Sequence, residues 1–485
     1  MSETNNENKF VYGVLDTFEL KGTNDIAVVG RVRGTVSKDD KIFITNYGDD
    51  DDELVVSSVV SLEIDRKQAD SATDCFVALR IRDGLSENIK PGSVIHSEDT
   101  EEGEIHLAYV TAIGDSYVGK RDLELYETEL TRMSITDCSE AWRIFIKIHE
   151  KKEGAFEDEE IKEFRRKVGN LARSLAKKIL AADEIYAVYN KKTGEPHMFS
   201  RTSKVNDDFV CSPPEIHIFS KPYRKIGEKH FPEDLFEIKK IERGEDGQGI
   251  RDFLFESFYL NGALGLRVNF EAVAIGAENV IPKPNYSGMK ENEIPVTNPN
   301  LVRWMLLRSQ ISNPTTDAEK MIAKIYYRFF AIEVMKAKFV IPAKPSDEKI
   351  EIPEEIAKQT EGVELQRLRF PIMVGKNRRN LVYLFTDMKR LRSMFDEEWS
   401  AFSQDVGKFV NNFDVGINIS NKYTLGCYIN KDTIEEIRRM LGLEVAKTEG
   451  ESEAAKAEDK DSDEGEAKAS NADEAKSDGD KKDEE

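Results

Sequence analysis

The sequence motif most suggestive of chemical activity is one that nearly matches a phosphate-binding loop. Gly114-Asp-Ser-Tyr-Val-Gly119-Lys120 has the glycine and lysine spacing of that loop and follows a strand-like apolar run over 107–113. A nucleotide site of this class also needs serine or threonine after the lysine, because that hydroxyl ligates the magnesium ion. Arg121 stands there instead, and the sequence contains no guanine-reading NKxD string. We therefore interpret the string as a turn and expect no cofactor.

The side chains that could serve a nucleophile or a metal are dispersed. Ser220 and Thr386 each follow an aromatic-ended strand, and we expect their hydroxyls to accept amide hydrogen bonds at the start of the next helix. His217 alternates with isoleucines, which predicts a solvent-facing side chain. A Ser-His-Asp relay stays open, since its members assemble through space. We expect no catalytic residue and no metal site, because no HxxxH or HExxH spacing occurs among the six histidines His96, His106, His149, His197, His217 and His230.

Basic clusters supply the candidate binding residues. One cluster occupies a predicted hairpin tip over 375–380, a second lies on the helix that follows, and a third is a pair of arginines that alternate on one strand face. Such groups can form a solvated face, contact a protein or contact RNA. The strand between tip and helix could hold the first two clusters apart. The candidate binding residues are Arg31, Arg33, Lys376, Arg378, Arg379, Lys389, Arg390 and Arg392.

Composition and charge limit the partners of this 485-residue chain. The formal net charge is -22, and the segment 10–98 carries 17 acidic against 10 basic residues. Such acidity disfavours RNA or a ribosome as partner and leaves a protein as the expected one. Hydrophobic residues amount to 39%, which suits several cores and no membrane span. The four cysteines form no CxxC pair and the amino terminus is acidic, which predicts neither disulfides nor structural zinc and favours a cytoplasmic protein.

The segment 10–98 has the pattern of a small antiparallel β-barrel. Short β-branched runs alternate with Gly, Asp and Ser clusters, and glycines at 30 and 34 would let a strand bend sharply. The strings Asp16-Thr-Phe-Glu-Leu-Lys-Gly22, Val28-Val-Gly-Arg-Val-Arg-Gly-Thr-Val36 and Lys90-Pro-Gly-Ser-Val-Ile95 resemble the second domain of elongation factor Tu-like translational GTPases. The resemblance implies a barrel that in that family lies beside a GTPase domain and often contacts tRNA or ribosomal RNA.

Helices followed by strands occur twice after the barrel. After a connector at 99–135, the segment 136–281 and the segment 296–445, joined by a proline-containing linker at 282–295, show the same order of elements. The string 216–221 parallels 382–387, and 264–269 parallels 415–420. Repetition at this length indicates duplicated domains rather than a solenoid. The predicted fold is therefore a small antiparallel β-barrel followed by two tandem α+β domains.

The second of these segments resembles the SseB family, named for enhanced serine sensitivity. The resemblance covers about 296–445 and is carried by Asn298-Pro-Asn-Leu301, Lys338-Phe-Val-Ile-Pro342, Leu384-Phe-Thr-Asp387 and Gly416-Ile-Asn418. The first segment departs from the pattern, with Tyr189 in place of the strand-ending proline, and is identified as SseB-like only through the internal repeat. The family implies an α+β fold and no established catalytic residues.

The last segment, 446–485, predicts a disordered acidic tail. It contains 16 acidic and 7 basic residues and no Leu, Ile, Val or aromatic side chain, so it cannot form a core. Together these features favour a non-enzymatic cytoplasmic SseB-family protein that acts as a protein-interaction or regulatory module. Two alternatives stay open: a translation-associated accessory factor that uses the barrel to contact ribosome or tRNA, and an enzyme or sensor of a small polar metabolite.

Overall fold

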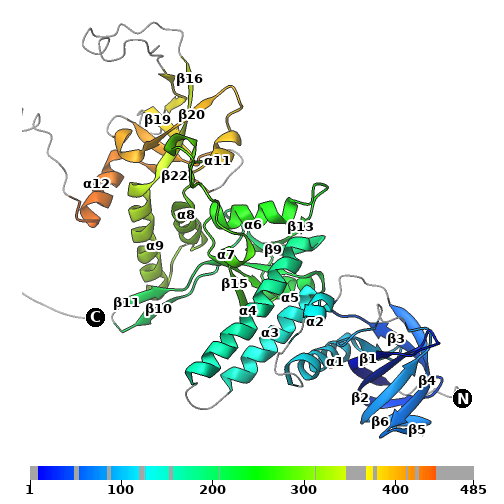
Figure 1. Cartoon of the computed structure of the whole chain (residues 1–485). Helices are drawn as coiled ribbons and strands as arrows, with labels where there is room; N and C mark the ends of the chain where they lie inside the picture. Colours follow the sequence, from blue (N-terminus) through cyan, green and yellow to red (C-terminus); the bar gives the residue numbers. More distant parts are fainter. Residues whose placement is uncertain are drawn as a thin grey trace, which may run out of the picture. The chain divides into compact units, whose positions relative to one another are not determined.

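The structure is a computed structural model of the chain (Figure 1). It describes residues 9–48, 54–84, 89–119, 125, 127–151, 157–206, 208–311, 313–345, 368–374, 380–410, 413–420 and 425–443. The chain divides into a unit that ends at Lys431 and a second unit that begins at Asp432. The predicted acidic tail at 446–485 lies outside the described residues. Helix α12 (Lys431–Met440) begins at the boundary between the two units.

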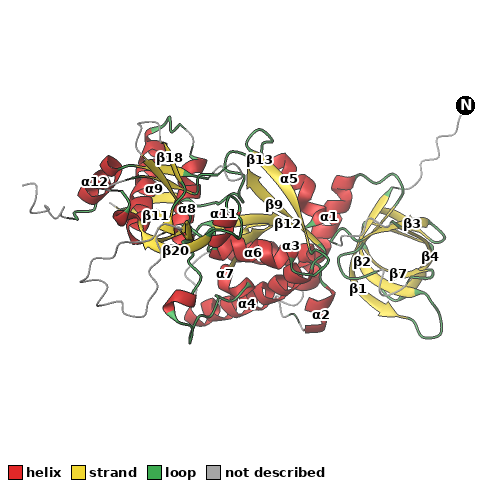
Figure 2. Cartoon of the chain, turned by 90° about the horizontal axis from the view of Figure 1, so that it is seen from above, coloured by secondary structure: helices red, strands yellow, loops and turns green. Residues whose placement is uncertain are grey.

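The amino-terminal strands form a closed antiparallel barrel, as the sequence predicts. Six strands follow one another in the order β1-β8-β3-β4-β7-β2, and pairing of β1 with β2 closes the ring (Figure 2). The short strand β5 (Lys67–Ala69) pairs with the end of β4, and β6 (Ser71–Thr73) pairs with the end of β2. The strands of the ring are β1 (Phe10–Glu19), β2 (Ile26–Ser37), β3 (Lys41–Thr45), β4 (Val55–Ile64), β7 (Phe76–Ile81) and β8 (Val94–His96).

Alternating side chains fill the barrel. Along β2, Val28 and Val32 point inward and are fully buried, whereas Arg31 and Arg33 are exposed. The hydroxyl of the fully buried Tyr12 donates to the carbonyl oxygen of Val77 at 2.9 Å, so its polar group is satisfied inside the core. This two-residue period is what the sequence of an antiparallel strand with one buried face requires.

The predicted connector at 99–135 is largely helical among its described residues. It contains α1 (Glu102–Ile113), a π-helical turn over Gly114–Gly119 and α2 (Glu127–Arg132). The strand predicted for 107–113 is therefore wrong. Buried residues Ala108, Tyr109, Ala112 and Ile113 recur at helical spacing, which places them on one face of α1. The glycine string thus continues a helix, whereas a phosphate-binding loop follows a strand.

A mixed sheet follows, flanked by helices. Its strand order is β13-β9-β12-β14-β15, and β12 and β14 are parallel neighbours. A separate two-stranded hairpin, β10 with β11, lies between β9 and β12 in sequence. The elements are α3 (Ile135–Glu150), α4 (Asp158–Ala181), β9 (Glu184–Asn190), β10 (Thr202–Val205), β11 (Asp208–Cys211), β12 (Glu215–Phe219), a 3-10 turn (Lys221–Tyr223), α5 (Arg224–His230), β13 (Phe236–Glu242), α6 (Gly249–Tyr259), β14 (Gly265–Val268), β15 (Phe270–Gly276) and α7 (Ala277–Val280).

The next strands form two sheets that follow a related order, with β17 beside β16 and β18 beside β19 as additional strands. β20 pairs with β16, a single bridge between Val340 and Phe385 links β16 to the end of β19, and β19 continues to β21 and β22. Here β19 and β21 are the parallel pair. The elements are a 3-10 turn (Glu291–Glu293), α8 (Pro299–Gln310), α9 (Asp317–Lys336), β16 (Lys338–Pro345), β17 (Leu368–Arg369), β18 (Ile372–Val374), β19 (Asn380–Leu384), α11 (Met388–Arg392), β20 (Ser400–Asp405), a second 3-10 turn (Val406–Lys408), β21 (Asp414–Ile417) and β22 (Cys427–Ile429). The mixed helix and strand content predicted after the barrel is confirmed.

The same hydrogen bond, from a backbone N–H to an asparagine side chain, occurs at the end of both parallel strand pairs, β12 with β14 and β19 with β21. Asn269 accepts the backbone N–H of Ser220 at 2.9 Å, and Asn418 accepts that of Thr386 at 3.0 Å. Both asparagines have positive φ, 59° and 52°. They are therefore equivalent, and the parallel between 264–269 and 415–420 predicted from sequence is two residues out of register. The predicted helix caps are wrong too: Ser220 makes no side-chain cap hydrogen bond, and Asp387 is the residue that caps α11.

Replacing either asparagine tests this repeated hydrogen bond. Asn269→Ala and Asn418→Ala each remove a buried acceptor and place alanine at positive φ, so each should lower the free energy of unfolding by about 3 kcal/mol. Asn206→Ala is the matched control, because Asn206 has a φ of 56° but is exposed. It should cost only about 1 kcal/mol. Urea unfolding measures all three, and equal losses would contradict a structural role for the buried acceptor.

Candidate functional site

A buried polar network occupies the end of the first parallel strand pair. Asn269 donates to Ser139 on α3 at 2.7 Å, while the hydroxyls of Ser220 and Thr136 lie 2.8 Å apart. All four residues are at most 5% exposed. Ligands of open α/β sheets bind at the carboxyl ends of parallel strands, but here α3 covers that edge. Both serine hydroxyls are engaged with neighbouring side chains, so this edge is used for packing.

A charged cluster adjoins the network and includes the barrel. Asp137 is 2% exposed, accepts a hydrogen bond from Tyr109 on α1 at 2.9 Å and pairs with Lys90 of the barrel at 3.1 Å. Glu140 is fully buried, forms an ion pair with Arg143 and accepts from Tyr223 at 3.3 Å. Burial raises the pKa of the Tyr109 phenol well above its ordinary value. Each carboxylate has a cation beside it, which is what a buried charge requires.

His106 is the histidine nearest these carboxylates. Its Nε2 lies 3.3 Å from the Tyr223 hydroxyl. Burial lowers the pKa of the half-buried imidazole, and the charge of Glu140 partly opposes that effect. Its ring also packs against Tyr47 of the barrel with centroids 4.9 Å apart. The cluster therefore joins the barrel to α1 and α3, a junction that no sequence motif indicates.

Arg390, predicted as a binding residue, is buried. Its side chain is 3% exposed and pairs with Asp387 at 2.6 Å, three residues earlier in the chain. It also pairs with Glu195 at 3.3 Å and donates to Asn261 at 2.8 Å, and both of these residues belong to the preceding sheet segment. The guanidinium therefore links the two sheet segments and is not available to an external partner. Basic residues at a helix start usually lie in solvent, so the sequence pattern could not show this.

The remaining predicted residues are dispersed. Lys389 forms an ion pair with Glu256, and Arg392 donates to the carbonyl oxygen of Trp399 at 2.9 Å. Arg31 and Arg33 share the outer face of β2, as predicted. Lys376, Arg378 and Arg379 lie outside the described residues. No common site is therefore formed by the described members of the predicted set.

The outer face of the barrel around Arg31 also carries an aromatic side chain. Phe76 is directly opposite Arg31 on β7, is 55% exposed, and lies beneath the guanidinium, 5.8 Å from the ring centroid. Such a contact between a cation and a ring stabilises both groups at a surface. Arg33, two residues further along β2, extends this face.

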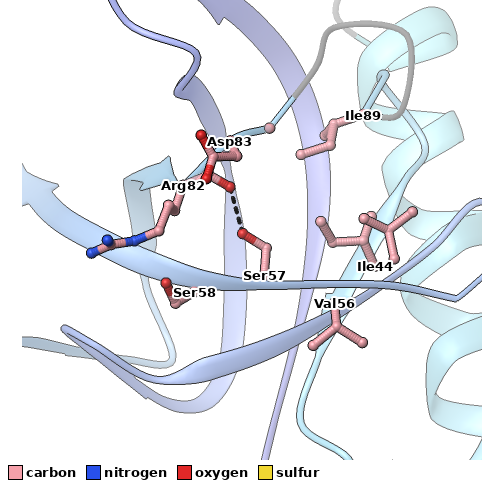
Figure 3. Close-up of a pocket in the computed structure, with 9 residues that line it drawn as sticks. Ile44, Val56, Ser57, Ser58, Arg82, Asp83 and Ile89 are labelled. Carbon is pink, nitrogen blue, oxygen red and sulfur yellow. Dashed lines mark hydrogen bonds between the residues drawn. The ribbon is translucent and has the colours of Figure 1, made fainter.

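A small pocket opens on another part of the barrel (Figure 3). Its volume is about 240 Å³, and Ile44 and Ile89 lie at one side, away from Arg82. Ser57 donates to the carbonyl oxygen of Arg82 at 2.6 Å, which ties β4 to the end of β7. The volume is below the roughly 300–1,000 Å³ of typical ligand clefts.

The hairpin of β10 and β11 exposes large apolar side chains. Val205, Phe209 and Val210 are 51%, 42% and 50% exposed. The base of the hairpin is held by Ser212, whose hydroxyl accepts the backbone N–H of Arg201 at 2.8 Å. An isolated two-stranded hairpin is only marginally stable in water. We therefore do not expect its large apolar side chains to stay exposed to solvent. Val205 and Val210 lie on the same face of the hairpin, and we call these two valines the hairpin surface.

Two histidines, His197 and His217, are buried among aromatic rings. The prediction that His217 faces solvent is wrong: it is 5% exposed and stacks on Phe219 with centroids 4.5 Å apart. Alternation fails here because both faces of β12 are covered. Burial lowers the pKa of His217 to about 3 and that of His197 to about 4. His217 Nε2 and His197 Nδ1 have no hydrogen-bond partner in the described part of the chain.

Two kinds of site are absent from the described residues. Among them, no three His, Cys, Asp or Glu side chains gather so that they could hold a metal ion. None of the helices described combines the length and the apolar character that crossing a membrane requires.

Comparison with known proteins shows partial likenesses to solved structures. No family model matches the chain, and neither does any curated protein. Translation elongation factor SelB from Methanococcus maripaludis, in its apo form and with the GTP analogue GppNHp, is 21% identical over 19% of this chain and 20% of that chain, with a TM-score of 0.17 in both cases. The match thus spans about a fifth of SelB. The predicted barrel is present as a closed antiparallel ring. The SseB resemblance has no support from the family models or the curated proteins.

The buried histidines predict an acid-sensitive fold. In the unfolded chain a histidine takes up a proton below about pH 6.5, whereas the folded chain keeps His197 and His217 neutral down to about pH 4 and about pH 3. Stability should therefore be complete above pH 6.5 and fall by about 2 kcal/mol per histidine by pH 4.5. Urea unfolding from pH 7.5 to 4.5 measures this loss, and His217→Phe should reduce it. An unchanged profile in the variant would contradict the assignment.

Proposed function

We propose that the chain is a non-enzymatic protein-interaction module that docks a partner through the hairpin surface. The observation that carries this proposal is the exposure of Val205 and Val210, two large apolar side chains on one face of a two-stranded hairpin. Exposed apolar clusters of this kind mark sites of protein association. In this account the two sheet segments with a related strand order are SseB-like units that hold the hairpin, and the setting is cytoplasmic.

The geometry of the hairpin favours a protein partner. Val210 lies opposite Ser203, and Val205 lies two residues along the same face, so the two valines form one apolar stripe. Phe209 belongs to the other face, together with Thr202. The Thr202 hydroxyl lies 3.4 Å from that of Tyr326 on α9, so this second face is the one toward α9. The valine face is therefore the one left for a partner.

Charge restricts the class of partner further. Residues 1–445 carry a formal charge of -13 once the acidic tail is set aside. Long-range attraction then favours a partner with a basic rim around an apolar patch, because such a surface is complementary to an acidic protein.

Serine substitutions on the valine face test the proposal. Val205→Ser with Val210→Ser removes apolar area without changing charge, and we expect at least about a tenfold loss of cross-linked partner, the effect of roughly 1.4 kcal/mol. Cross-linking mass spectrometry in lysate provides the measurement. The matched control is Leu107→Ser with Ile148→Ser, on α1 and α3, at positions that are 51% and 50% exposed. A hairpin variant that keeps the wild-type partners would refute docking at this surface.

A second candidate function is a translation-associated accessory that contacts ribosome or tRNA through the barrel. The observation that favours it is the outer face on which Arg31 lies over the exposed ring of Phe76 and Arg33 follows two residues further along β2. Proteins that bind single-stranded RNA combine arginines, which contact the phosphates, with exposed aromatic rings, on which the bases stack. The net charge of -7 over 10–98 opposes this candidate, so the clustered arginines would have to act locally.

Charge reversal separates this candidate from the first. Arg31→Glu with Arg33→Glu should abolish co-sedimentation with ribosomes at low salt, and the wild-type association should weaken as salt is raised. Arg66→Glu with Lys67→Glu changes the charge equally at the exposed turn between β4 and β5 and should leave sedimentation unchanged. Equal sedimentation of the first variant and wild type would exclude RNA contact by this face.

A further inference from the structure

A cavity of about 660 Å³ lies between the first sheet segment and helices α8 and α9. One wall contains Met198, Phe199 and Phe236, and the opposite wall contains Leu307, Ile311 and Ile322. The Gln310 amide fixes the two walls to each other: it accepts the backbone N–H of Met198 at 3.0 Å and donates to its carbonyl oxygen at 2.7 Å. The volume lies within the roughly 300–1,000 Å³ of ligand clefts.

A buried polar atom without a partner belongs to this cavity wall. His197 lines the cavity, and its ring lies edge-on to Phe199 and Phe236 with centroid separations of 4.5 and 4.8 Å. Its Nδ1 is covered and has no hydrogen-bond partner among the described residues. An unsatisfied buried nitrogen destabilises the folded chain, so each such group calls for an explanation. The apolar wall of the cavity therefore includes one nitrogen that no described residue satisfies.

The rim of the cavity carries a lysine without an ion pair to any other described residue. Lys192 is exposed at the rim, and no ion pair to its ammonium occurs in the described part of the chain. Two acidic side chains of the lining are already engaged: Glu271 with Arg201, and Glu319 with the backbone of Thr315 and Thr316. Asp234 is the remaining acid of the lining.

We infer that this cavity binds a small amphipathic carboxylate, with its apolar part between the two walls and its charge at Lys192. The apolar walls select a chain or ring, and the unpaired ammonium selects a negative head group. Because both walls contribute, the ligand would hold α8 and α9 against the first sheet segment. This site is separate from the hairpin surface and from the barrel.

Calorimetric titration of the full chain with octanoate and with octanamide tests the inference. Octanoate should bind with a Kd below about 1 mM, and octanamide, which has the same chain but no charge, should bind at least about tenfold more weakly. Lys192→Gln should reduce octanoate binding to the level of octanamide. Lys204→Gln, at an exposed hairpin lysine that does not line the cavity, is the matched control.

A second variant addresses the buried histidine. His197→Phe should raise the melting temperature of the free chain, because it removes the unpaired nitrogen. Lys192→Gln is a surface change that leaves the fold intact, so its result stands even if His197→Phe fails to fold. Absence of octanoate binding up to about 10 mM, or equal binding by wild type and Lys192→Gln, would overturn the inference.

Discussion

The arrangement of the two sheet segments depends on the neutralisation of one enclosed guanidinium. Arg390 is 3% exposed, and its charge is balanced by Asp387 in its own segment and by Glu195 in the preceding one. A buried charge that loses its partners is strongly destabilising, by about 3–5 kcal/mol. Any relative displacement of the segments would separate Arg390 from Glu195 and Asn261. The ion pair therefore selects one arrangement out of those that apolar packing alone would allow.

The surfaces that carry the functional proposals follow from that arrangement. Gln310 of α8 can bond the backbone of Met198 only while the segments keep this position, and Tyr326 of α9 meets Thr202 at the base of the hairpin in the same way. These contacts create the cavity and orient the hairpin so that its valine face is left for a partner. A second charged junction, Lys90 with Asp137, attaches the barrel to α3. Buried polar groups thus determine how the segments are joined, and the exposed apolar groups supply the binding surfaces.

Local sequence pattern predicted the elements better than their contacts. The barrel was predictable because its strands alternate buried and exposed residues, as around Val32. The helix over 102–113 was missed because its apolar residues form a continuous run, which a buried strand and a buried helix share. The two-residue error between Asn269 and its equivalent Asn418 arose because a shift of two residues keeps every strand side chain on the same face, so the apolar alternation matches in either register. The burial of His217 and of Arg390 depends on residues far away in the chain, which pattern within one segment cannot show.

A double-mutant cycle on Arg390 and Glu195 tests the central claim most directly. Arg390→Met, Glu195→Gln and the double variant are unfolded in urea, and the difference between the double loss and the sum of the single losses gives the coupling energy between the two side chains. The account predicts a coupling of about 1–3 kcal/mol, because either single change leaves a buried group without its partner. A coupling near zero would show that the two sheet segments are not joined through this pair, and would contradict the account of how the cavity and the hairpin are held.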